Sequence, residues 1–194
     1  MSAKQKYRPL WVSLHWLMAL LIFITFGIGL ASLSTQAKGT AGGKLIPLSI
    51  HIILGIAILV IVLIRYILRM LVFAKRARRT GSATKLVVKK APFLDQLSVY
   101  VHPLLYLLTA LMAVLGIAIA LPANLFTIIW FRAAGSPAAA IPTDFYVYPA
   151  RVWHGTLSLL LMLLIVQHVL VAIFHQFLKG ENFLGRMWFT LREK

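Results

Sequence analysis

Four long stretches without a charged side chain constrain this chain more than any other feature. A bilayer-spanning helix needs about 20 consecutive apolar residues, and each stretch is close to that length or longer. The chain is 61% hydrophobic and 12% charged, whereas soluble domains are about 45–50% apolar and about 25% charged. We therefore predict an all-α fold, a four-transmembrane-helix bundle in one membrane domain over residues 1–194. The predicted helices cover about 10–33, 47–69, 97–121 and 152–178.

The first stretch could alternatively be a signal peptide, with Lys4, Lys6 and Arg8 as its basic region and a cleavage site within Ala31–Ala37. The apolar core of a signal peptide is about 7–15 residues long. The uncharged stretch Leu10–Leu33 is longer than that. We therefore expect a retained membrane helix.

The net charge of +16 is distributed unevenly between the two sides of the predicted bundle. The N-terminal tail, the end of the second helix with its following loop, and the C-terminal tail carry most of the Lys and Arg residues. Only Lys38, Lys44, Arg132 and Arg151 lie on the other side. An excess of basic residues marks the cytoplasmic side of membrane proteins. We therefore predict that both termini are cytoplasmic and that the basic residues contact anionic lipid, with no nucleic-acid partner.

The second outer loop, Pro122–Ala150, is aromatic and nearly uncharged. Aromatic side chains concentrate at membrane–water interfaces. This composition predicts a short interfacial helix at about 125–132.

Histidine is the residue type that suggests chemistry. The chain has no cysteine, which excludes thiolate metal sites, iron–sulfur clusters and covalently attached c-type haem. An ionisable side chain within a membrane helix is costly and often functional, although a lone histidine can also hydrogen-bond a neighbouring helix. The six histidines lie in or at the ends of the apolar stretches: His15, His51, His102, His154, His168 and His175.

The fourth predicted helix holds two histidines fourteen residues apart, His154 and His168. Fourteen residues turn through about 1400° and rise about 21 Å, so the two side chains share a face near opposite leaflets. With a cytoplasmic N-terminus, His15 lies near the inner side and His51 near the outer side. Depth therefore pairs His51 with His154 and His15 with His168, while His102 competes with His15 on the inner side.

Two imidazoles for each site suit a six-coordinate haem better than zinc, which takes four protein ligands or three plus water. Helical bundles place such cofactors between facing helices. We interpret His102 and His175 as polar groups near a haem propionate or a quinone; His175 could equally lie at the interface without a role. Arg65 and Arg69 could pair with propionates or extend to the inner headgroups.

Several short motifs resemble one family. They are SLHW at Ser13–Trp16, IHIILG at Ile50–Gly55, the two arginines Arg65 and Arg69, HPLLYLL at His102–Leu108, WHG at Trp153–Gly155, and the pair His168 and His175 followed by LKGENFLGRM, which ends at Met187. The chain resembles the prokaryotic cytochrome b561 family, which is related to the cytochrome b subunits of hydrogenases and formate dehydrogenases. The resemblance implies a protein of the bacterial inner membrane that holds two b haems. His15 and His168 would bind the inner haem iron, and His51 and His154 the outer one.

Three functions remain open at this point. The chain could carry electrons from a periplasmic donor, with superoxide as one candidate, through both haems to ubiquinone, as an oxidoreductase of cytochrome b561 type. It could instead anchor a periplasmic dehydrogenase or a larger respiratory complex, with the outer loop as the docking surface. Finally, it could be a transporter or scaffold whose histidines only pack. A visible spectrum separates the last function from the first two.

Overall fold

The computed structural model describes residues 9–33, 45–80, 93–130 and 149–180, together with 185 and 187, and all structural statements refer to these residues. The described chain is helical and contains no strand, which confirms the predicted all-α class. Its elements are α1 (Pro9–Ile28), which continues as the π-helix η1 (Gly29–Leu33), α2 (Leu45–Thr80), α3 (Phe93–Ala120), α4 (Leu125–Trp130) and α5 (Pro149–Phe177).

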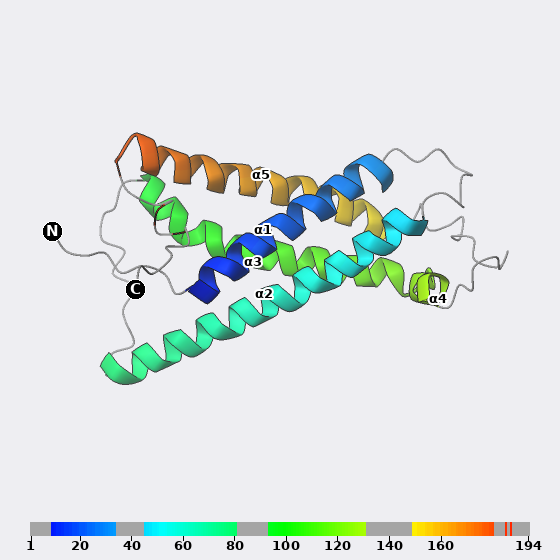
Figure 1. Cartoon of the computed structure of the whole chain (residues 1–194), viewed down its shortest axis with the longest axis horizontal. Helices are drawn as coiled ribbons and strands as arrows, with labels where there is room; N and C mark the ends of the chain where they lie inside the picture. Colours follow the sequence, from blue (N-terminus) through cyan, green and yellow to red (C-terminus); the bar gives the residue numbers. More distant parts are fainter. Residues whose placement is uncertain are drawn as a thin grey trace, which may run out of the picture.

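Four of these helices, α1, α2, α3 and α5, are long and apolar enough to cross a membrane. They run alternately up and down, so that α1 and α3 begin where α2 and α5 end (Figure 1). We name this the inner end and the opposite one the outer end, after the orientation that the basic residues predict. The four-helix bundle is thus confirmed, whereas the cytoplasmic position of the termini stays a prediction.

The helices pack in an open order, in which α1 lies on α2, α2 on α3, and α3 on α5. The pairs α1–α5 and α2–α5 make few direct contacts at most among the described residues. A small apolar core closes the outer end, where Leu48 of α2, Ile119 and Ala120 of α3 and Leu125 of α4 are buried together. The interior between α5 and the α1–α2 pair is therefore left largely unfilled by direct helix packing.

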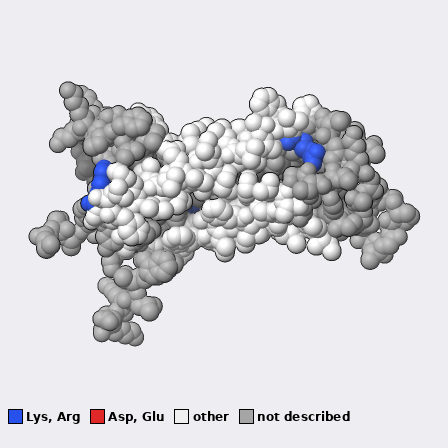
Figure 2. Space-filling model, turned by 90° about the horizontal axis from the view of Figure 1, so that it is seen from above, with Lys and Arg blue, Asp and Glu red and all other residues white. Residues whose placement is uncertain are grey.

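The surface between the two ends is apolar. Large hydrophobic side chains such as Leu107, Leu159 and Leu163 are more than 60% exposed. The basic side chains of the described residues appear mainly near the two ends, with a broad uncharged zone between them (Figure 2). Exposed apolar surface of this extent costs free energy in water, so we expect this zone to face lipid.

The helix α2 is longer than predicted, because it continues beyond residue 69 to Thr80. Its 36 residues give a length of about 54 Å, well over the roughly 30 Å of a bilayer core. The extension has the sequence AKRARR, and Ala, Lys and Arg are among the best helix formers. Low hydropathy ended the predicted membrane segment, but it did not end the helix.

The other helix bounds differ from the predictions by a few residues. Pro103 lies inside α3, which begins at Phe93. Proline is tolerated within membrane helices because neighbouring groups can satisfy the backbone. A six-residue helix, α4, lies within the predicted range 125–132. Its position at the membrane interface stays a prediction, and residues 131–148 of the outer loop lie outside the described residues.

Candidate functional site

At the outer end, α2 and α5 bring two histidine rings close together in an edge-on arrangement. The ring centroids of His51 and His154 lie 6.1 Å apart, with an angle of 66° between the ring planes. These two helices do not pack closely on each other, so the imidazoles extend toward one another across the open interior. The pairing predicted from depth is therefore present in the geometry of the described residues.

The imidazole of His51 is oriented by a neighbouring helix. Its Nδ1 lies 3.0 Å from the backbone carbonyl oxygen of Thr25 on α1. A carbonyl can only accept, so Nδ1 carries the proton and donates it to Thr25. The other nitrogen, Nε2, is then left with a free lone pair, which is the form of imidazole that binds a metal.

A cavity of about 660 Å³ surrounds the outer pair. Cavities that bury organic ligands span about 300–1,000 Å³. Two glycines on its wall, Gly55 and Gly155, face open space, since a Cβ added at either would meet no heavy atom within 4 Å. A broad, flat group can approach the backbone closely at such positions. The cavity is also lined by Met112 of α3 and by Arg151.

The second outer histidine, His154, rests against α3. A Cβ added at Gly116 would lie 3.5 Å from His154 Cε1. Within the described residues, the Nδ1 atom of His154 is buried and makes no hydrogen bond like the one that His51 donates to Thr25.

At the inner end, α1, α3 and α5 bring three histidines together. The ring centroids of His15 and His168 lie 6.4 Å apart, and those of His102 and His168 lie 5.0 Å apart. With a metal–nitrogen bond of about 2 Å, and a centroid about 1.2 Å behind the nitrogen, imidazoles on opposite sides of one metal have centroids about 6.4 Å apart. The spacing therefore favours His15 over His102 as the partner of His168.

A buried arginine lies beside the inner histidines. Arg65 of α2 is only 8% exposed. Its Nε donates to the hydroxyl of Tyr106 at 3.1 Å, and one terminal nitrogen donates to the carbonyl of Trp11 at 3.4 Å. Guanidinium carries five N–H donors, so these two bonds leave donors for another acceptor. Neither acceptor is charged, and a buried cation is costly without an anion.

The remaining predicted residues are placed as follows. Arg69 is exposed on α2, one turn beyond Arg65. His175 is 6% exposed on α5 near the inner end, and His102 is exposed. Their contacts with a propionate or a quinone stay predictions.

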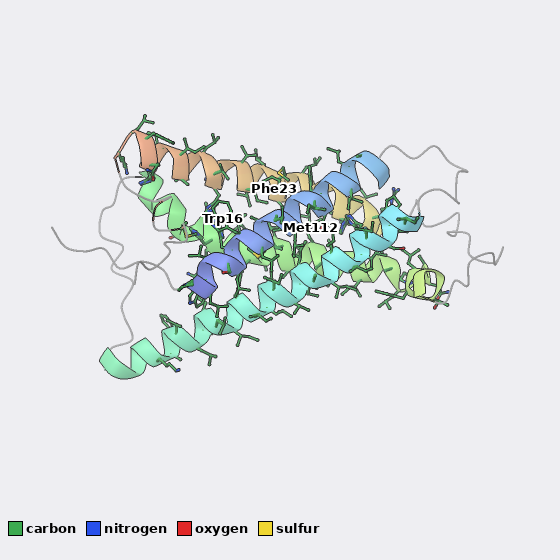
Figure 3. The ribbon with its side chains drawn as sticks, in the orientation of Figure 1. Trp16, Phe23 and Met112 are labelled. Atoms are coloured by element: carbon green, nitrogen blue, oxygen red, sulfur yellow. The ribbon has the colours of Figure 1, made fainter. Side chains whose placement is uncertain are left out.

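Trp16, the neighbour of His15, connects α1 to the end of the chain. Its indole N–H donates to the carbonyl of Met187 at 2.9 Å. Figure 3 labels Trp16 and Phe23 on α1 and Met112 on α3. The segment after α5 therefore reaches back to the neighbourhood of the inner histidine pair.

The donor set fits a haem that takes two protein ligands. No group of three or more His, Asp or Glu side chains is suitably placed for a metal ion within the described ranges, whereas zinc needs at least three protein ligands. At each end two imidazoles face one another at a spacing that one metal ion can bridge. At the outer end, open glycine positions leave room for a flat ring between them.

Comparison with known families decides the relationship. The model of the family described as prokaryotic cytochrome b561 matches residues 6–190. The chain belongs to the prokaryotic cytochrome b561 family. No curated protein matches the chain significantly.

Membership in the prokaryotic cytochrome b561 family confirms the resemblance drawn from the short motifs. The family binds b-type haem and transfers electrons in the membrane. Together with the four apolar helices, this makes the chain a multi-pass protein of the inner membrane.

Several residues at these sites were not found by sequence reasoning. Tyr106 lies four residues after His102, within a motif that had been noticed, so helical spacing could have placed it on the same face. Gly116 had no such signal. The Thr25 contribution is a backbone carbonyl, which every residue type carries, and composition gives no sign of it.

Proposed function

We propose that this cytochrome carries electrons across the membrane through two b haems, each held by two histidines. His15 and His168 would bind the inner iron, and His51 and His154 the outer iron. Electrons would enter from a donor at the outer end and leave to ubiquinone. The observation that carries the proposal is the pair of matched histidine spacings, 6.4 Å and 6.1 Å, at opposite ends of the bundle.

The fourteen-residue separation on α5 supports two sites over one. His154 and His168 lie on the same uninterrupted helix, about 21 Å apart along its axis. One haem cannot take both as axial ligands at that distance. Each finds an imidazole from another helix at its own depth instead, and the two sites share α5 as their common support.

When bound, each haem iron supplies one-electron redox chemistry at a potential set by its ligands and surroundings. The residues of the chain would hold and tune it. The Thr25 carbonyl keeps His51 in the metal-binding tautomer, and apolar walls around the outer pair limit access of water. At the inner end Arg65 supplies a buried positive charge and spare donors, which suit a haem propionate.

Arg151, on the wall of the outer cavity, supports entry of an anionic donor at the outer end. A positive group beside a cleft raises the local concentration of anions, and superoxide is the anionic donor that we propose. The alternative role, anchoring a periplasmic dehydrogenase, would use the outer loop, most of which lies outside the described residues. Purifying the protein under mild conditions tests that role, because a dehydrogenase subunit should then accompany it.

The ligands are tested by substituting each histidine and recording reduced-minus-oxidised spectra. We expect His51→Ala or His154→Ala to remove the outer haem and to leave the inner one intact. His15→Ala or His168→Ala should do the reverse. His102→Ala is the control, and it should keep both haems. A colourless wild-type preparation would refute the proposal, and loss of the inner haem in His102→Ala with retention in His15→Ala would refute the inner pairing.

A further inference from the structure

Helix α1 touches the outer histidine pair although it supplies no outer ligand. Its Thr25 carbonyl accepts the hydrogen bond from His51 Nδ1 at 3.0 Å. One turn later, Gly29 lies against the same ring, where an added Cβ would be 3.2 Å from Cε1 and 3.6 Å from Nδ1. The last turn of α1 and the first residue of η1 therefore contact the same edge of one imidazole.

The contact at Gly29 is closer than a side chain would allow without movement. Carbon atoms pack best about 3.5–4.0 Å apart, so a Cβ at 3.2 Å would require a shift of a few tenths of an ångström. The ring cannot turn freely to make that room, because its Nδ1 is bound to Thr25. The equivalent contact of His154 with Gly116 is looser, at 3.5 Å.

The backbone also changes form at this point. Helix α1 ends at Ile28, and Gly29 begins the π-helix Gly29–Leu33. Each backbone hydrogen bond of a π-helix spans five residues instead of the four of an α-helix, and such turns are frequent at functional sites. The change in winding begins at the residue that lies against His51.

We propose that Gly29 and the Thr25 carbonyl form a clamp on His51, which fixes its ring and sets the electron affinity of the outer site. The inference rests on the proposed function, because it takes His51 as an outer ligand. A hydrogen bond from Nδ1–H makes the imidazole a stronger ligand, and a stronger donor favours the oxidised iron. Weakening the clamp should therefore raise the outer midpoint potential.

The test compares Gly29→Ala with the wild type in two measurements. A redox titration followed in the visible spectrum gives the two midpoint potentials, and electron paramagnetic resonance of the oxidised protein reports the orientation of the axial rings. We expect a higher outer potential and altered outer g-values in Gly29→Ala. The inner signals should stay unchanged, because the clamp touches His51 alone. Selective loss of the outer haem would also support the clamp.

A matched glycine on the same helix serves as the control. A Cβ at Gly27, two residues earlier on α1, would meet nothing within 4 Å. Gly27→Ala should therefore resemble the wild type. The clamp is overturned if Gly29→Ala leaves the outer signals unchanged, if Gly27→Ala shifts them equally, or if Gly29→Ala loses both haems.

Failure of the clamp can be separated from failure of the proposed function. If His51→Ala keeps the outer haem, His51 is no ligand and the proposed function fails with the clamp. If His51→Ala loses the outer haem while Gly29→Ala shows wild-type potentials and g-values, only the clamp fails.

Discussion

Inserting one leucine after Leu163 of α5 tests whether the spacing between His154 and His168 holds two sites in register. The insertion lies between the two histidines in a run of apolar residues. Leu163 is 65% exposed, so the change begins on the surface that we expect to face lipid. The apolar character of the helix is kept, and membrane insertion should survive.

The size of the effect follows from helix geometry. One extra residue adds only about 1.5 Å of rise but rotates everything beyond it by about 100°. At a radius of about 5–6 Å, a rotation of 100° moves a side chain by about 8–9 Å. The His15–His168 centroid distance is 6.4 Å. The displacement exceeds the separation that the metal must bridge, so one of the two sites must lose its ligand.

The assay is the ratio of haem to protein in the purified variant, together with its reduced spectrum. We expect about half of the wild-type haem and one remaining α band. A matched control combines the same insertion with deletion of Val166, which restores the fourteen-residue spacing and leaves only Leu164 and Ile165 rotated. This control should recover the full haem content.

Normal binding and reduction of both haems in the variant with the single insertion would refute the reasoning. The spacing on α5 would then be incidental, and the two histidines would not act as fixed ligands on one helix. Low haem content in both the single insertion and the compensated control would instead attribute the loss to general damage to α5. That result would also remove the support for register as the cause.

Two further predictions concern charge. Arg65→Met should lower the inner midpoint potential, because the reduced inner site would lose about 1–2 kcal/mol of electrostatic stabilisation, the interaction of unit charges about 10 Å apart at an effective dielectric of about 20. A redox titration measures this shift. The control is Arg69→Met, which removes an exposed arginine and should give a smaller shift. A reporter active only outside the cytoplasm should be silent when fused at Lys85 and active at Thr40, two positions outside the described residues, and the opposite pattern would invert the proposed direction of electron transfer.

The pairing of histidines was predictable because it depends on rise and rotation along helices. The separation of His154 from His168 and the alternation of helix direction together assign each imidazole a depth from the sequence alone. What depth left open was the choice between His15 and His102 on the inner side. The ring centroid of His168 lies 6.4 Å from that of His15 and 5.0 Å from that of His102, and this difference favours His15. The sequence predicts the depth of each histidine but not the lateral distance between helices.

Other features depend on contacts that residue types do not reveal. The structure places Gly29, the first residue of the π-helix η1, against His51, and the residue type alone does not predict that contact. Thr25 contributes its backbone carbonyl. Arg65 could have been a surface residue near the headgroups, and only packing shows that it is buried against Tyr106.

The order of helix packing suggests a structural role for the histidine pairs in addition to the redox role that we propose. Direct packing joins α1 to α2, α2 to α3 and α3 to α5. The pair His15–His168 links α1 to α5, and the pair His51–His154 links α2 to α5, so each connects helices with little direct contact. A cofactor bound by both members of a pair would supply the missing connection. Because each pair forms only in the assembled bundle, cofactor binding and folding should be coupled. The position of α5 should depend most on cofactor binding, because this helix supplies one histidine to each pair.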